Sequence, residues 1–188
     1  MYVVTTGPTQ RPITLAEAKT WVAVDTVDTD ALIEMLIDSA TEQVENLTEL
    51  ALGSRTLEEY FDCLKLPLEL GISPVTAISL IEYRDDVDGT YQTWADTNYD
   101  TDLISMPARI SLLPDGTAPT VGSYANAIRV TYTAGYTSTN MPKRAKQAIS
   151  LLVADGYDNR EDMEQNESNN VRQRSAAILM KQLSPRKI

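Results

Sequence analysis

The feature that most constrains the fold is a run of apolar residues at three- and four-residue steps between residues 30 and 50. Side chains at this spacing share one side of an α-helix, so the run predicts a long amphipathic helix with one buried stripe. At 1.5 Å per residue such a helix is about 30 Å long, the width of a small domain. Gly53 is a suitable residue to end it. The stripe consists of Leu32, Ile33, Leu36, Ile37, Ala40, Val44, Leu47 and Ala51.

Three further helices are predicted, one before this helix and two near the C-terminus. Thr14 and Glu17 have the spacing of a capping box and predict a helix over residues 14–22. Residues 142–158 predict another, with a proline in its first turn. Residues 171–183 predict the last, with a thin apolar seam. That seam consists of Val171, Ile178, Leu179 and Leu183.

Between the helices, residues 55–133 are rich in short β-prone runs separated by turn signals. The clearest run alternates, with Ile128, Val130 and Tyr132 on one face. Short connections favour antiparallel pairing. The predicted fold class is therefore α+β: an N-terminal helical pair, a central small antiparallel sheet and C-terminal helices. We expect one domain over residues 1–161 and a C-terminal arm over 162–188.

The sequence contains no histidine and a single cysteine, Cys63. This composition excludes Ser-His and Cys-His nucleophiles, intramolecular disulfides and zinc sites built on cysteine or histidine. Cys63 lies among apolar residues and is predicted to be a buried, inert thiol. A hydrolase working through paired carboxylates stays open because there are 27 acidic residues, but no pair stands out. Neither a catalytic residue nor a cofactor is predicted.

Two acidic runs resemble calcium-binding loops but fail at the decisive positions. Aligning Gly89 with the loop glycine places Arg84 and Ala95 where the first and last acidic ligands must stand. In the second run, over residues 96–107, Thr101 replaces the glycine and Pro107 the closing glutamate. We therefore predict no metal site in either run.

The net charge of −11 argues against a protein that grips nucleic acid by neutralising phosphates. It is compatible with a protein past which DNA slides without specific binding. No apolar run is long enough to cross a membrane, and residues 1–8 do not form a secretory signal. The single cysteine fits synthesis in a reducing cytoplasm.

Charge is unevenly distributed near the C-terminus. Between Asp155 and Glu167 there are six acidic residues and one basic residue, whereas residues 171–188 contain five bases and no acid. This distribution is that of a solvated terminal helix or of a basic arm that docks on an acidic partner, and the thin seam favours docking. A basic tail that touches DNA is the third option. The residues predicted to dock are Arg172, Arg174, Ile178, Leu179, Lys181, Leu183, Arg186 and Lys187.

Several segments together resemble the head–tail connector (head-completion, or adaptor) proteins of long-tailed double-stranded-DNA phages and prophages. The similarity is most specific in residues 130–161, with VTYTAGY at 130–136, MP at 141–142, KQAISLLVA at 146–154 and YDNRE at 157–161. PITLAEAK at 12–19, DALI at 30–33 and PARI at 107–110 are also similar to segments of that family.

The resemblance implies a structural subunit of a ring, of twelve copies, at the head–tail junction of a virion. Such a ring docks on the portal protein and extends the DNA channel toward the next neck or tail-completion protein. A heterologous ring contact needs two different complementary patches on each subunit, and the acidic and basic C-terminal segments are one candidate pair. A stopper or tail-completion protein of the same neck is the alternative that the sequence leaves open.

Overall fold

The computed structural model describes residues 1–87, 89–159 and 167–184, in which the chain divides into two units. The sheet unit comprises Met1–Thr9 and Ser54–Gly135, and the helical unit comprises Gln10–Gly53 and Tyr136–Ile188. Each unit is thus assembled from two separate stretches of sequence. The predicted boundary between residues 161 and 162 lies outside the described residues, so that division stays a prediction.

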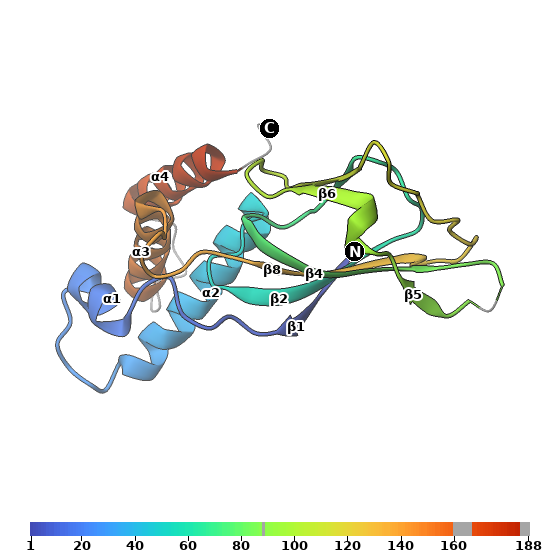
Figure 1. Cartoon of the computed structure of the whole chain (residues 1–188). Coiled ribbons are helices and arrows are strands. Elements are labelled where there is room, and N and C mark those ends of the chain that lie inside the picture. Colours follow the sequence, from blue (N-terminus) through green and yellow to red (C-terminus); the bar gives the residue numbers. More distant parts are fainter. Residues whose placement is uncertain (88, 160–166, 185–188) are drawn as a thin grey trace. The chain divides into compact units, whose positions relative to one another are not determined.

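The sheet unit contains two antiparallel sheets (Figure 1), where the sequence indicated a single one. A five-stranded sheet has the order β1-β2-β8-β4-β5, and a three-stranded sheet has the order β3-β7-β6. The strands of the larger sheet are β1 (Tyr2–Thr6), β2 (Arg55–Phe61), β4 (Val75–Arg84), β5 (Tyr91–Thr93) and β8 (Ile128–Ala134). Those of the smaller are β3 (Leu68–Glu69), β6 (Tyr99–Asp102) and β7 (Arg109–Leu112), and the 3-10 turn η1 (Asp96–Asn98) precedes β6.

Strand β8 lies at the centre of the larger sheet and confirms the alternation read from the sequence. Ile128, Val130 and Tyr132 are almost fully buried, while the residues between them are partly exposed. Tyr132 Oη donates a hydrogen bond of 2.9 Å to Glu59 Oε2, and Gly71 N donates one of the same length to that oxygen. A Cβ atom at Gly71 would lie 2.9 Å from Glu59 Oε1, so a larger residue there would displace the Glu59 carboxylate.

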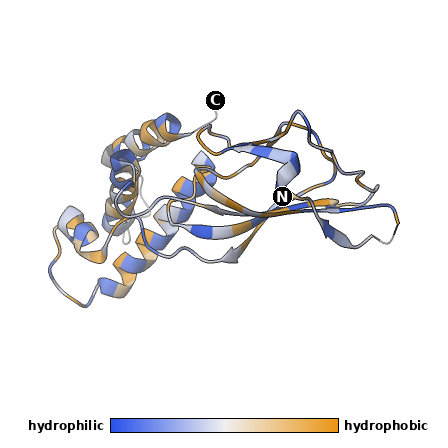
Figure 2. Cartoon of the chain, viewed as in Figure 1, coloured by the Kyte–Doolittle hydropathy of each residue, from blue (hydrophilic) through white to orange (hydrophobic). Residues whose placement is uncertain are grey.

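The helical unit contains α1 (Leu15–Val22), α2 (Asp30–Thr48), α3 (Lys143–Asp158) and α4 (Glu167–Leu183). The predicted α+β class is therefore confirmed. Figure 2 shows hydrophilic and hydrophobic residues alternating along α2, as its amphipathic pattern requires. The hydrophobic core draws on all four helices. Its fully buried side chains include Ala18, Ile33, Ile37, Val44, Ala145, Ala148, Ile149, Val153 and Ala176.

Helix α2 ends earlier than predicted. Its last helical residue is Thr48, and Glu49 adopts the left-handed conformation (φ 57°) with its N–H bonded to the Glu45 carbonyl at 2.9 Å. The prediction that Gly53 ends the helix is therefore wrong, because a non-glycine residue closes the last turn. Leu47 was assigned to the buried stripe but is 56% exposed. Thr48 is buried instead. Its burial is tolerated because its hydroxyl donates a hydrogen bond to the Val44 carbonyl.

The capping box at the start of α1 is confirmed and has a consequence for acid stability. Thr14 N donates to Glu17 Oε2 at 2.7 Å, and Lys146 Nζ lies 3.1 Å from Glu17 Oε1. The backbone hydrogen bond from Thr14, followed by the bond from Lys146, lowers the pKa of Glu17 below its usual value. A carboxylate with a lowered folded-state pKa stabilises the fold above its unfolded pKa of about 4.3, and that contribution is lost as pH falls.

Glu17→Gln should therefore lose less unfolding free energy than the parent chain between pH 6 and pH 3. Glutamine keeps the capping geometry but not the charge. Urea unfolding followed by circular dichroism at several pH values measures the difference. Glu42→Gln, at an exposed position on α2, is the matched control and should follow the parent. Identical acid dependence in Glu17→Gln and the parent would contradict the assignment.

Candidate functional site

The predicted docking arm is helix α4, which packs against α3 within the helical unit. Ala176 is fully buried and Met180 is 6% exposed, and both belong to the core. Leu179 and Leu183 are partly buried against the same core. The helix is therefore held by one complete apolar side and does not depend on a partner to cover it.

The predicted seam of α4 is wrong at two of its four positions. Val171 is 63% exposed and Ile178 is 60% exposed, whereas the buried positions are taken by Ala176 and Met180. The prediction assumed that the large aliphatic residues of α4 form its buried side. The helix instead turns a small residue and a flexible methionine toward α3, an arrangement that allows close packing.

Polar contacts join the start of α4 to the end of α3. Arg172 forms an ion pair with Asp158 and donates to the Ala154 carbonyl at 3.4 Å. Gln173 Nε2 donates to Asp155 Oδ2 at 3.0 Å, and Asn159 Nδ2 donates to Asp155 Oδ1 at 3.1 Å. The acidic end of α3 and the basic start of α4 thus pair within one chain.

The structure sorts the predicted docking residues into two groups. Arg174, Ile178 and Lys181 are exposed, whereas Arg172, Leu179 and Leu183 face the helical unit. Arg186 and Lys187 lie outside the described residues. Val171, which was not among the predicted docking residues, is also exposed. The steps of three and four residues place these exposed positions on one side of the helix. We call Val171, Arg174, Ile178 and Lys181 the outer stripe of α4.

The outer stripe combines two exposed aliphatic side chains with two cations. Such a surface can bury apolar area against a partner while pairing with acidic groups at its edge. The interleaved spacing was visible in the sequence, but Val171 had been assigned to the buried side. Arg172 already forms an ion pair with Asp158 in the same chain, so it is less available to pair with another protein.

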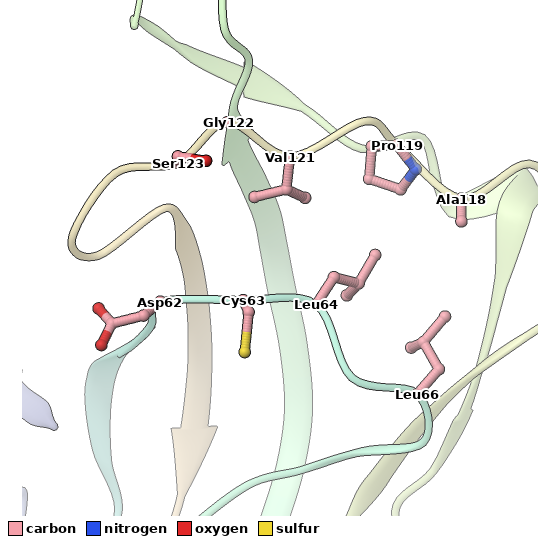
Figure 3. Close-up of a pocket in the computed structure, with 9 residues that line it drawn as sticks. All are labelled: Asp62, Cys63, Leu64, Leu66, Ala118, Pro119, Val121, Gly122 and Ser123. Carbon is pink, nitrogen blue, oxygen red and sulfur yellow. The ribbon is translucent and has the colours of Figure 1, made fainter.

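Cys63 is exposed, so the prediction of a buried thiol is wrong. It follows the end of β2 in a bend and lines a pocket of about 560 Å³ in the sheet unit. Figure 3 shows Leu64 and Leu66 pointing toward the wall that carries Pro119 and Val121, while the Cys63 side chain points away from that wall. The apolar residues near Cys63 in the sequence therefore indicate that Leu64 and Leu66 face the pocket, and they do not indicate that the cysteine is buried.

The acidic run over residues 96–107 is organised by hydrogen bonds to one carboxylate, that of Asp102. Asp102 accepts hydrogen bonds from Ser105 Oγ at 2.6 Å and from Arg109 Nη2 at 2.7 Å, and also from the backbone N–H groups of Ser105 and Ile104. The Ser105 hydroxyl, with Arg109 next, holds the pKa of Asp102 well below its usual range. Its carboxylate thus fastens the turn before β7. In the described part of the chain no three acidic or cysteine side chains are grouped to hold a metal ion.

Comparison with known proteins gives a family match over part of the chain and a fold over all of it. Residues 12–84 match the family model of the phage gp6-like head-tail connector protein. This range includes the segments 12–19 and 30–33 but not the block 130–161, on which the resemblance chiefly rested. No curated protein matches the chain. None of the described helices has the length and apolar character needed to cross a membrane.

Solved structures match the chain over its full length. A chain in the virion of the native gene transfer agent (GTA) particle has a TM-score of 0.78 and 19% identity. A chain in the neck of the empty GTA particle computed with C6 symmetry has a TM-score of 0.78 and 20% identity. A chain in the neck of the native GTA particle computed with C12 symmetry has a TM-score of 0.74 and 20% identity. Each match covers 100% of this chain and 97% of the other.

The family match confirms the resemblance to head–tail connector proteins over residues 12–84, and the structural matches show that the whole chain has the fold of proteins in gene transfer agent particles.

Proposed function

We propose that the chain is a structural, non-enzymatic subunit of a ring at the head–tail junction of a phage or phage-like particle. The observation that carries this proposal is the connector-family match at residues 12–84 in a chain whose complete fold matches chains of a particle neck. The ring has twelve copies, a number supported by the C12 symmetry with which one of those necks was computed. The net charge of −11 lets DNA pass through the channel without being held.

The ring docks on the portal protein through the outer stripe of α4 and presents its other end to the next neck or tail-completion protein. The stripe supports this role because its aliphatic and basic side chains are exposed, while α4 itself is fixed on α3 by Ala176 and Met180. A rigidly held helix loses little conformational entropy when a partner binds it.

The proposal is tested by mixing the purified chain with the portal protein of the same particle, followed by native mass spectrometry and negative-stain imaging. We expect a portal-bound ring. Monomers that do not bind the portal under any condition would refute the proposal.

The outer stripe is tested by Arg174→Glu combined with Ile178→Asp. Both side chains are exposed, so the fold should persist. Portal affinity should fall by about 100-fold, because one basic anchor is reversed in charge and one aliphatic anchor becomes charged. Deleting everything from residue 171 is a poorer test, because it also removes Ala176 and Met180 from the core.

The matched control is Lys65→Glu combined with Val87→Asp in the sheet unit. It makes the same change of charge at an exposed base and an exposed aliphatic residue. Biolayer interferometry with immobilised portal compares the two double variants. Equal affinities would show that the stripe does not contact the portal.

Cys63 provides a way to distinguish a connector from a stopper or tail-completion protein. It is the only cysteine in the chain and it is exposed, so a maleimide–gold reagent marks one position per subunit. Imaging labelled particles should place the gold directly below the portal. Gold at the tail-proximal end of the neck would favour the stopper or tail-completion role.

A further inference from the structure

A second surface of the helical unit combines a groove with exposed aromatic and basic side chains, and no other described part of the chain covers it. A groove of about 330 Å³ runs between α1 and the start of α3. Trp21 on its wall is 50% exposed, in contrast to Trp94, which is 4% exposed and donates from Nε1 to the Thr117 carbonyl. Half-exposed tryptophans are frequent anchors of protein interfaces. The lining residues are Ile13, Glu17, Trp21, Lys143, Lys146, Gln147 and Ser150.

Two lysines, Lys143 and Lys146, line this groove, and Arg144 follows one of them in the sequence, although the chain as a whole is acidic. Lys143, Arg144 and Lys146 lie within four residues in the first turn of α3. Lys146 pairs with Glu17, whereas Lys143 and Arg144 are exposed and form no ion pair with any residue that the structure describes. Cations in the first turn of a helix are disfavoured by the helix dipole, so these side chains do not stabilise α3 itself. We call the lining residues Trp21, Lys143 and Lys146, together with the adjacent exposed Arg144, the basic groove.

Helix α2 carries a surface of opposite character on the side that faces away from its core residues. Glu34, Asp38 and Glu42 follow one another at four-residue steps and form a row of carboxylates. Beside this row Met35 is 60% exposed. Arg11 pairs with Asp38 at 2.8 Å and with Glu34 at 3.4 Å, while Glu42 has no ion-pair partner among the described residues. We call Glu34, Met35, Asp38 and Glu42 the acidic face of α2.

We propose that the basic groove of one copy binds the acidic face of α2 of the next copy, with Met35 seated against Trp21. This inference rests on the proposed ring. The two surfaces are complementary. The groove has an aromatic ring and two cations that form no ion pair with a described residue, and the face has a flexible thioether and three carboxylates, two of which share Arg11. Sulfur–aromatic contacts of methionine are favourable. Because the two surfaces differ, every copy can use the groove toward one neighbour and the face toward the other, which is the heterologous contact that a ring requires.

A nucleic acid fits the groove less well. Three bases are few for phosphate binding, and Glu17 places a carboxylate beside Lys146 at 3.1 Å. An acidic protein surface can still bind here, because Lys146 neutralises Glu17 and the carboxylates of the partner can pair with Lys143 and Arg144. The copies of the chain themselves supply such a surface.

Two charge-reversal variants test the contact. The groove variant is Lys143→Glu with Arg144→Glu, and the face variant is Asp38→Arg with Glu42→Arg. We expect each alone to raise the concentration needed for ring assembly by at least about 10-fold, in the absence or presence of portal, whichever supports the parent ring. Native mass spectrometry and light scattering measure assembly. Lys65→Glu and Asp115→Arg, at exposed positions of the sheet unit, are the controls and should assemble like the parent.

The decisive experiment mixes the two defective variants in equal amounts. The groove variant then has two acidic surfaces and the face variant two basic ones, so the copies can bind only in alternation. We expect rings to reappear with an even number of subunits and equal numbers of each variant. Labelling the two variants with different isotopes allows native mass spectrometry to count the copies of each variant in a ring.

The outcomes separate this contact from the ring itself. If the parent forms no ring even with portal, the proposed function fails. If the parent forms rings and both variants do so equally well, or if the mixture of two defective variants stays unassembled, the contact is wrong. Loss of binding to a 30-base-pair duplex in the groove variant, with assembly unchanged, would assign the groove to nucleic acid and also overturn it.

Discussion

Replacing Tyr132 by alanine is expected to lower the free energy of unfolding by about 3–5 kcal/mol, the usual cost of removing a large buried aromatic side chain. Tyr132 has no exposed surface, and its strand β8 is bonded to β2 on one side and to β4 on the other. Its loss leaves a cavity in the central strand and removes one of the donors to Glu59. Tyr132→Phe keeps the ring and should cost only about 1–2 kcal/mol.

The control for this substitution is Tyr2→Ala in strand β1. Tyr2 is 43% exposed on an edge strand, so its removal should cost less than about 1 kcal/mol. Urea unfolding followed by circular dichroism compares the three variants with the parent chain. Similar losses for Tyr2→Ala and Tyr132→Ala would show that β8 is not the central strand of a packed sheet.

Replacing Ala176 by glutamate is expected to release helix α4 from α3. The position is fully buried, and an unpaired carboxylate there would cost about 3–5 kcal/mol, which is more than a single packed helix face can offset. Undocking exposes the carboxylate to water instead. Trypsin should then cleave at Arg174 and Lys181 at least about 10-fold faster than in the parent, and portal binding should be lost although the outer stripe is unchanged in sequence.

Ala177→Glu adds the same charge one residue further along, at an exposed position. It should resist trypsin as the parent does. The pair therefore distinguishes a helix that must be held in place from one that binds the portal as a free peptide. If Ala176→Glu binds portal normally, the packing of α4 is irrelevant to docking. Equal protease resistance in the two variants would contradict the described packing.

The local parts of the fold could be predicted from the sequence because they depend on neighbouring residues. The capping box at Thr14 and the alternating strand over 128–133 are set by spacings of two to four residues, and both are confirmed. The order of strands in the sheet could not be predicted in this way. Strand β8 pairs with β2 and β4, which lie far away in sequence, and no local pattern specifies such a pairing.

The candidate site was only partly predictable for a related reason. Composition located a basic arm, but which side of α4 faces α3 depends on the shape of α3. Ala176 fits against α3 and Ile178 stays exposed, the reverse of their hydrophobicity. The basic groove was missed altogether, because Trp21 and Lys143 meet only after two helices from opposite ends of the chain pack together.

The division of the helical unit into two stretches has a consequence during protein synthesis. Helices α1 and α2 leave the ribosome first, but much of the core to which Ile33 and Ile37 belong is contributed by α3 and α4. The intervening sheet segment delays them by roughly 80 residues, or about 4–16 s at ordinary rates of translation. The sheet segment can fold during that time, whereas the nascent helical pair must wait with its apolar stripe uncovered. A chaperone that binds nascent chains would therefore act on α2, and the last helix to emerge would complete the core.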